Sequence, residues 1–436
     1  MAVSKHPKKT HPEKKHKPKP PKSNPVTATP GGPTSPTTGQ PVFAQPTPSP
    51  DPTGFVDTTS DEGDYSLNDP TLMEPIPTPT GGATEPVLTL QQVWGDAGAA
   101  KVAAITESGQ IVFHAVGDTG NSYGPATQSL VADKMVSDFT EADPADVPSF
   151  FFHLGDVIYN FGEGAYYYDQ FYEPYRNYPA PIVAIPGNHD GVVYKTDPSP
   201  TLEAFLRNFC APTPAVSTDV GGLSRTAQIQ PGVFFTFDAP FVRILGIYSN
   251  VLEDPGVISS QGDSSSPVSD IQLDYLAAAL TRAKTENYAG ALIIAVHHPP
   301  YTYDSTHGSS PRMLQDIDQA ATTAGFWPHA VLSGHAHNYQ RFTRTNGDTQ
   351  IPYIIGGCGG HDVDPIQSGS DGAIRTPLSV SSTVTFESYD DTDYGYLRII
   401  VTAETLTVEY HPASDGAGTK TPDDVVTVDI QTRTIS

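Results

Sequence analysis

Several short apolar runs in this sequence are followed by Gly or Pro and then by Asp, Asn or His, and this feature constrains the fold most strongly. Five such motifs follow in order: GDTG (117–120), GDVIY (155–159), GNHD (187–190), VHHP (296–299) and GHAH (334–337). Apolar runs that alternate with stretches of helical periodicity are typical of a layered α/β domain. Loops at the carboxyl ends of strands build the site in such domains. We therefore expect the five motifs to converge.

The same pattern predicts where the regular elements lie. The apolar runs predict strands at 111–116, 149–154, 181–185, 233–237, 242–247, 291–296, 329–332, 353–355, 396–402 and 405–410. Helical spacing of apolar residues predicts helices at 126–139, 166–175, 200–209, 269–285 and 312–324. Because Tyr168, Phe171, Tyr172 and Tyr175 fall on one face of the second of these helices, we expect that face to pack into the core.

The beginning of the chain has a different composition. Residues 1–86 are rich in Pro, Thr, Ser and Gly and contain few large apolar residues. Such a segment buries too little apolar surface to offset its chain entropy. We therefore predict a disordered leader over 1–86 and a folded domain over 87–436. The Lys- and His-rich opening is interpreted as a solvated tail, with an electrostatic tether or a weak metal-binding tract as alternatives.

Charge and apolar runs exclude several partners. The chain carries 24 Lys and Arg against 49 Asp and Glu, a net charge of −25, although its first 22 residues are basic. An acidic body repels a polyanion, so we expect no nucleic acid partner, and we expect any phosphorylated substrate to be small. The longest apolar run, 291–296, is far shorter than the roughly 20 residues of a membrane span. No apolar stretch of signal-peptide length follows the basic start, and the two cysteines, Cys210 and Cys358, allow at most one disulfide.

The five motifs together offer seven oxygen and nitrogen donors of the kind that transition metals bind. They are Asp118, Asp156, Tyr159, Asn188, His297, His335 and His337. One ion takes only about four to six protein ligands, so seven donors with a carboxylate able to bridge indicate two ions. A pair of metal ions can clamp a phosphoryl group and activate water near neutral pH.

The five motifs resemble those of the calcineurin-like metallophosphoesterases, over roughly residues 111–360. Two details resemble the purple acid phosphatase branch: Gly120 replaces a histidine common in the superfamily, and Tyr159 follows Asp156 by three residues. GHAHNYQR (334–341) and YIIGGCGG (353–360) are also similar to that branch. A phenolate can supply the missing ligand, and it favours a hard trivalent iron.

This resemblance implies a role for each motif residue. Asp118, Tyr159 and His337 would hold Fe(III), Asp156 would bridge, and Asn188, His297 and His335 would hold a divalent ion (Fe, Zn or Mn). His189 corresponds to the histidine that contacts the phosphate, and His307 to the histidine that protonates the leaving group. Asp190 stands where this branch usually has Glu, and His298 is an additional histidine, for which a solvent-facing loop position is one reading.

The implied fold is a four-layer α/β/β/α sandwich with two mixed sheets, forming a single catalytic domain. The implied function is hydrolysis of phosphate monoesters by a hydroxide that a dinuclear metal centre activates, as in an acid phosphatase. Alternatives are a phosphodiesterase or nucleotide hydrolase on the same site, or a non-catalytic protein that binds metal or phosphate. A secreted or periplasmic location follows from the resemblance alone, and the oligomeric state stays open.

Overall fold

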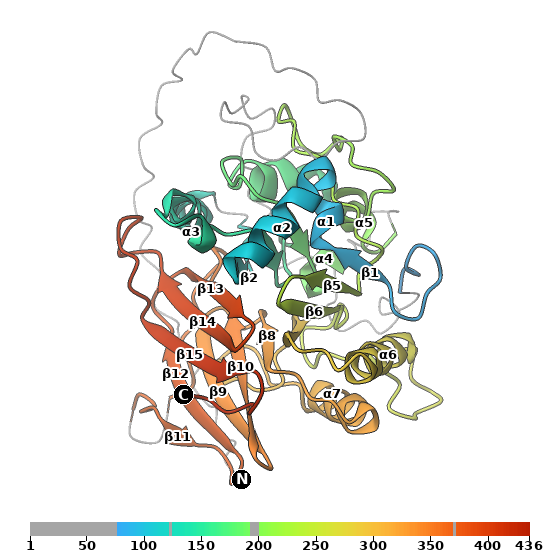
Figure 1. Cartoon of the computed structure of the whole chain (residues 1–436), viewed down its shortest axis with the longest axis vertical. Coiled ribbons are helices and arrows are strands. Elements are labelled where there is room, and N and C mark those ends of the chain that lie inside the picture. Colours follow the sequence, from blue (N-terminus) through green and yellow to red (C-terminus); the bar gives the residue numbers. More distant parts are fainter. Residues whose placement is uncertain (1–75, 122–123, 192–199, 369–371) are drawn as a thin grey trace, which may run out of the picture. The chain divides into compact units, whose positions relative to one another are not determined.

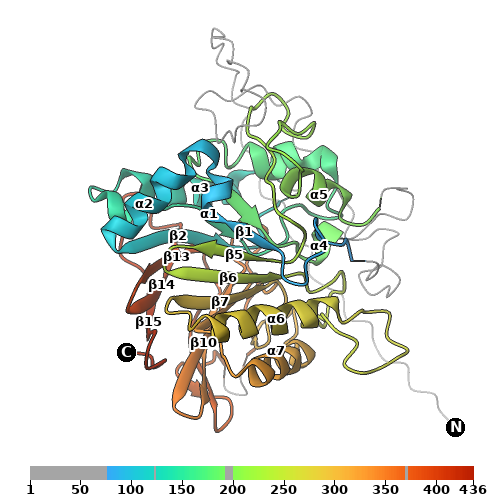
Figure 2. The ribbon, with the colours of Figure 1, turned by 45° about the vertical axis from the view of Figure 1, so that its right-hand side comes forward.

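Two mixed β-sheets packed face to face, with helices on their outer faces, form the described part of the protein (Figures 1 and 2). The structure is a computed structural model, and it describes residues 76–121, 124–191, 200–368 and 372–436. All of these residues belong to one compact unit. The four-layer α/β/β/α arrangement predicted from the sequence is confirmed.

The larger sheet has nine strands in the order β1-β5-β6-β7-β8-β10-β9-β12-β11. Its neighbours β6, β7, β8 and β10 run parallel, and the strands beyond β10 are antiparallel. Its strands are β1 Val87–Thr89, β5 Phe235–Ala239, β6 Val242–Ile247, β7 Ala291–Val296, β8 Ala330–Ser333, β9 Tyr339–Asn346, β10 Thr349–Gly356, β11 Leu378–Ser379 and β12 Val384–Asp390.

The smaller sheet has six strands in the order β15-β14-β13-β2-β3-β4. The parallel set β2, β3 and β4 lies at one side, and the antiparallel set of β13, β14 and β15 continues from β2. The strands are β2 Gln110–Val116, β3 Phe151–His153, β4 Ile182–Ala184, β13 Gly395–Thr402, β14 Thr405–Pro412 and β15 Asp424–Asp429.

The helices form the two outer layers. Figure 2 shows α6 and α7 on the side of the nine-stranded sheet, and α2 and α3 on the opposite side, by the six-stranded sheet. The α-helices are α1 Leu90–Val93, α2 Gly98–Ser108, α3 Ala126–Ser137, α4 Asn188–Gly191, α5 Glu203–Phe209, α6 Ile271–Thr285 and α7 Pro311–Ala324. The 3₁₀ turns are Gly95–Ala97, Asp138–Thr140, Pro144–Asp146 and Gly164–Tyr166.

The ends of α7 show how local sequence sets a helix boundary. The Ser310 hydroxyl accepts a hydrogen bond from the Met313 N–H, and Pro311 occupies the first helical position. Gly325 ends the helix with a left-handed backbone, φ 63°. A side-chain cap, an early proline and a terminal glycine are common helix boundaries, because each suits the unpaired backbone groups there.

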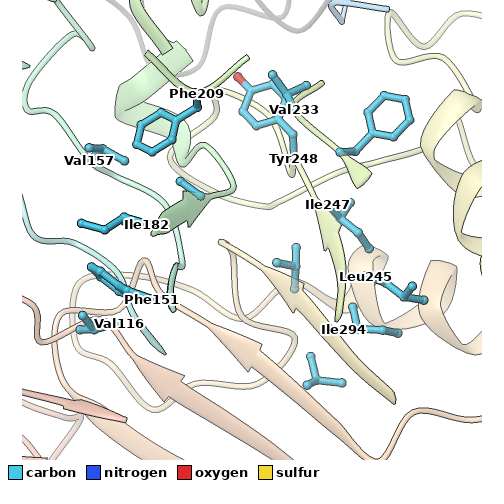
Figure 3. Close-up of a cluster of buried hydrophobic side chains, with 14 of the residues drawn as sticks. Val116, Phe151, Val157, Ile182, Phe209, Val233, Leu245, Ile247, Tyr248 and Ile294 are labelled. Carbon is cyan, nitrogen blue, oxygen red and sulfur yellow. The ribbon is translucent and has the colours of Figure 1, made fainter. Parts of the chain in front are cut away.

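Alternation along the strands separates two apolar cores. In β2, Phe113 faces the core between the sheets, whereas Val116 faces the helical layer. Phe152 and Phe151 divide in the same way in β3, because successive side chains of a strand point to opposite faces. Figure 3 shows part of the core that faces the helices. Val116, Phe151 and Ile182 lie on one side of it, and Leu245, Ile247 and Ile294 lie on the other. Burial on both faces explains why the strands appear in the sequence as continuous apolar runs.

The segment predicted as the helix 166–175 differs from a regular helix. The structure forms a π-helical turn at Tyr168–Tyr172 after a 3₁₀ turn. Its aromatic side chains are nevertheless buried in the core, as the spacing predicted. The sequence analysis also missed α2, whose only buried residues are Gly98 and Ile105. An alanine-rich helix with so little buried surface carries almost no apolar periodicity.

The predicted leader, 1–86, lies outside the described residues as far as residue 75. Residues 76–86 are described, and they contact the folded domain. The Thr80 N–H donates to the Pro231 carbonyl at 2.6 Å. The Glu85 carboxylate accepts two bonds from Arg282, at 2.7 and 2.8 Å, and one from the Thr236 hydroxyl at 2.8 Å. The packed part of the chain therefore begins before β1.

Two further expectations concern membrane spans and cysteines. Among the described residues, no helix combines the length and apolar character that crossing a bilayer requires. Cys210 and Cys358 are both free thiols. Cys358 is buried, and burial raises the pKa of its thiol to about 12.

Candidate metal centre

The five motifs of the sequence analysis meet where the carboxyl ends of parallel strands in both sheets approach one another. Asp118 follows β2, Asp156 follows β3 and Asn188 follows β4, all in the six-stranded sheet. His297 follows β7, and His335 and His337 follow β8, in the nine-stranded sheet. The His335 N–H donates to Oδ2 of Asp118 at 2.8 Å, which joins the loops of the two sheets directly.

Two carboxylates and one imidazole form the centre of this cluster. Nε2 of His297 lies 3.3 Å from Oδ2 of Asp156 and 3.8 Å from Oδ1 of Asp118. Ligand atoms of these three buried residues all lie within 4.8 Å of one another. The Leu154 carbonyl accepts from Nδ1 of His297 at 2.9 Å, so Nε2 is the ring nitrogen that faces the carboxylates.

Two groups of three donors each share one residue with this centre. The Tyr159 hydroxyl lies 3.1 Å from Oδ1 of Asp118 and 3.2 Å from Nε2 of His337, which brings together the triad predicted for Fe(III). Oδ1 of Asn188 lies 3.0 Å from Nε2 of His297 and 3.2 Å from Nδ1 of His335, which brings together the triad predicted for the divalent ion. We call these groups the tyrosine triad (Asp118, Tyr159, His337) and the asparagine triad (Asn188, His297, His335).

Three of the site residues have backbone conformations that residues other than glycine usually avoid. Asp118, Asp156 and His335 have positive φ values of 56°, 53° and 69°. A Cβ atom on Gly187 would lie 2.1 Å from Oδ1 of Asp156, so only glycine fits there. Strained backbone of this kind costs about 1–3 kcal/mol per residue and is concentrated at functional sites.

The charges in the cluster influence one another strongly. Burial raises the pKa of Asp118 to about 8, and the charge of Asp156 acts in the same direction. Burial also acts to raise the pKa of Asp156, but His297 and His189 bring it well below its ordinary range. For His297, Asp156 and Asp118 outweigh burial and raise the pKa to about 9. Buried carboxylates that depend on nearby histidine charge are a donor set that fits a multivalent cation.

His189 and His307, the two histidines predicted to act on substrate, both lie beside the cluster. The His189 N–H donates to Oδ1 of Asp156 at 2.9 Å, and its Nδ1 donates to the Asn160 carbonyl at 2.8 Å. The ring of His307 is centred 4.6 Å from that of His335 and 4.8 Å from that of His337. The structure therefore brings together all nine residues that the sequence analysis assigned to the site.

Carboxylates that the sequence analysis missed surround His307. Nε2 of His307 lies 3.5 Å from Glu253, and Nδ1 lies 3.3 Å from Asp304 and 3.8 Å from Asp364. Burial by itself would lower the pKa of His307, but Asp304 and Glu253 raise it to about 10. The imidazole of His307 is thus held in its protonated form. Glu253 and Asp364 follow no apolar run, so the pattern that found the other residues could not find them.

His361 was also missed. Its ring stacks on Tyr159 with centroids 3.6 Å apart and an angle of 4° between the planes. Its N–H donates to the Asp118 carbonyl at 3.0 Å, and its Nδ1 donates to the Gly120 carbonyl at 3.0 Å. The only available signal was its position directly after GGCGG, a motif already singled out.

Two residues that depart from the purple acid phosphatase pattern have structural contacts. Asp190 accepts hydrogen bonds from the backbone N–H groups of Val157, Ile158 and Gly187, and so ties the second motif to the third. His298 is fully buried, and its ring bonds the Ser249 hydroxyl at 2.7 Å and the Leu252 carbonyl at 2.8 Å. The solvent-facing reading of His298 is therefore wrong, because both ring nitrogens are satisfied inside the fold.

This buried group of carboxylate, imidazole, amide and phenol donors, where loops of the two sheets meet, has the ligand types that first-row transition metals bind. The family model of the calcineurin-like phosphoesterases matches residues 111–339, just over half of the 436-residue chain. The chain belongs to this family. Membership supports a phosphoester hydrolase, and the family uses dinuclear metal centres.

The chain is also similar, at low sequence identity, to several solved structures. GAP50, described as the anchor in the inner membrane complex of Plasmodium, is 13% identical with a TM-score of 0.49 and covers 74% of this chain and 89% of its own. PhoD is 13% identical with a TM-score of 0.45, and the match covers 75% of this chain and 71% of the PhoD chain. A dimetal phosphatase from Danio rerio is 11% identical with a TM-score of 0.43, and the match covers 74% of this chain and 99% of the phosphatase chain. No curated protein matches the chain.

Proposed function

We propose that this protein hydrolyses phosphate monoesters at a dinuclear Fe(III)–M(II) centre of the purple acid phosphatase type. The observation that supports it most strongly is that the two triads meet at His297 and Asp118, 3.8 Å apart, with the carboxylate of Asp156 3.3 Å from His297. A non-catalytic binding protein is less well supported, because every donor of the pattern is present and lies within reach of its partners.

The tyrosine triad is assigned to Fe(III) and the asparagine triad to the divalent ion, with Asp156 between them. Burial and the charges of Asp156 and Asp118 hold the pKa of Tyr159 well above its ordinary value. The phenol therefore binds a cation only when that cation can displace its proton, which favours a hard trivalent ion. The chemistry that such a pair supplies when bound is to clamp a phosphoryl group and to activate water.

The remaining steps belong to residues of the chain. His189 is fixed through Nδ1 by the Asn160 carbonyl, and we assign its other ring nitrogen to a phosphate oxygen. The protonated ring of His307 has Glu253 beside Nε2 and Asp304 beside Nδ1. We assign to this ring the proton that the departing alkoxide takes up. Proton donation to a poor leaving group lowers the barrier of ester cleavage by general acid catalysis.

Metal content and colour give the first test. Protein purified without chelator should contain two transition-metal ions per chain, at least one of them iron. Because an iron-bound phenolate absorbs visible light, the oxidised protein should be purple to pink, and Tyr159→Phe should bleach it. Elemental analysis and the visible spectrum measure both. Tyr275→Phe, which removes a buried hydroxyl in α6, should keep the colour. A colourless iron-loaded wild-type protein would exclude Tyr159 as a ligand.

The carboxylates around His307 make a prediction about the substrate. Glu253, Asp304 and Asp364 all lie within 4 Å of that ring, on the side assigned to the leaving group. Further phosphates on the leaving group would be repelled there. A simple monoester should therefore exceed a nucleoside triphosphate in kcat/KM by about tenfold or more, equivalent to about 1.4 kcal/mol.

A phosphatase screen across pH with an alkyl monoester, a nucleoside triphosphate and a phosphodiester measures this preference. Higher kcat/KM on the triphosphate would favour the nucleotide hydrolase alternative, and higher kcat/KM on the diester would favour a phosphodiesterase.

A further inference from the structure

Two buried polar atoms, one of them in the asparagine triad, lie close together without a hydrogen bond. They are Nε2 of His335, a residue only 2% exposed, and Oδ1 of Asp254, and the distance between them is 3.8 Å. Within the described ranges, neither atom has a hydrogen-bond partner. Buried polar atoms are almost always paired, so an unpaired donor and an unpaired acceptor that face each other require an explanation.

The orientation of the His335 ring supplies one. Its Nδ1 points into the cluster, 3.2 Å from Oδ1 of Asn188. If Nδ1 donates its lone pair to a metal ion, the neutral ring must carry its proton on Nε2. That N–H then points at Asp254, and a movement of about 1 Å brings the two atoms to the roughly 2.9 Å of an N–H···O bond.

Asp254 has a second contact, through its other oxygen. Oδ2 accepts a hydrogen bond from the Gly308 N–H at 2.9 Å, next to His307 in the chain. The same carboxylate thus contacts both a proposed metal ligand and the loop that carries the proposed acid. The ring centroids of His307 and His335 are 4.6 Å apart.

We propose that Asp254 is a positioning residue for the divalent ion. Its Oδ1 accepts the Nε2–H of His335 and so fixes the tautomer in which Nδ1 binds metal, while its Oδ2 holds the His307 loop in place. This inference rests on the proposed dinuclear function. Carboxylates that orient a ligating histidine typically change metal affinity by about 10–100-fold when they are removed.

Zinc titration of the metal-free protein by calorimetry, with wild type and Asp254→Ala, tests the proposal. We expect two Zn²⁺ ions to bind wild type, and we expect the variant to lose about 10–100-fold in affinity at one of the two sites only. Asp263→Ala removes an exposed carboxylate of the same loop and should leave both affinities unchanged. If Asp254→Ala keeps both wild-type affinities, the proposal is overturned.

A near-isosteric variant guards against misfolding. The side chain of Asp254→Asn has one oxygen, which can accept from either His335 or Gly308 but not from both, so its Zn²⁺ affinity should fall between those of wild type and Asp254→Ala. Thermal unfolding of each variant checks that the fold is retained. Asp254→Asn protein that folds and binds both ions as tightly as wild type would count against the proposal in the same way.

The histidine tautomer separates this inference from the proposed function. Long-range ¹H–¹⁵N spectra of metal-free protein should show His335 protonated on Nε2 in wild type, and a mixture of tautomers in Asp254→Ala. Wild-type protein that binds fewer than two Zn²⁺ ions would refute the dinuclear centre. An unchanged His335 tautomer in Asp254→Ala would refute the role of Asp254 whatever the metal content.

Discussion

Asp156→Asn should cost more activity than any other single change at the site. The carboxylate lies 3.3 Å from Nε2 of His297 and also accepts the His189 N–H at 2.9 Å, so it contacts the asparagine triad and the proposed phosphate-binding residue together. As the proposed bridge it serves both ions, and asparagine brings neither the charge nor the second oxygen. Metal ions supply several kcal/mol of transition-state stabilisation, so we expect kcat/KM to fall by about 10³-fold or more.

Metal content shows whether this loss has the proposed cause. Elemental analysis of Asp156→Asn should find substantially fewer than two ions per chain. Asp316→Asn is a matched control, since Asp316 is a buried carboxylate of α7 that accepts a hydrogen bond from the Ser259 hydroxyl at 2.8 Å and is not one of the proposed ligands. That control should retain its metals. Asp156→Asn protein with both ions and near-normal activity would remove Asp156 from the bridging position.

His307→Ala should slow the enzyme by an amount that depends on the leaving group. A general acid matters only while the departing oxygen needs a proton. We therefore expect a loss in kcat/KM of about 10²-fold or more on an alkyl phosphate, and a much smaller loss on a nitrophenyl phosphate. Comparing both substrates on wild type and variant measures the difference directly.

The alternative for His307 is a purely structural role. The ring packs between Glu253, Asp304 and Asp364, and its loss could loosen the loop that connects β7 to α7. That alternative predicts equal losses on both substrates and a lower melting temperature. Unchanged metal content with a large difference between the substrates would support proton donation, whereas equal losses would exclude it.

Three polar side chains outside the proposed site have structural partners. Arg341 and Arg344, which follow GHAH, pair with Asp424 at 2.6 Å and with Asp318 at 2.5 Å. His114 of β2 bonds Asp138 at 3.0 Å. These side chains are therefore engaged in contacts within the fold.

Apolar runs in the sequence predict the strands that carry the site, and the residues after those runs are its donors. β2, β6 and β7 lie at or within one residue of their predicted bounds, because a strand buried on both faces must be continuously apolar. Asp118, Asp156 and His297 come two, three and one residues after β2, β3 and β7. Parallel pairing of β2 and β3 then brings Asp118 and Asp156 to the same edge of one sheet.

The side chains that surround those donors come from segments that folding brings together. Glu253, Asp254 and Asp364 lie in loops without regular spacing, and they reach His307 and His335 through folding of segments that are distant in the sequence. His361 gains its position by stacking on Tyr159, a contact between residues some 200 positions apart. Local sequence patterns reflect periodic burial within one element, whereas the orientation of a metal ligand depends on the side chains that other loops bring beside it.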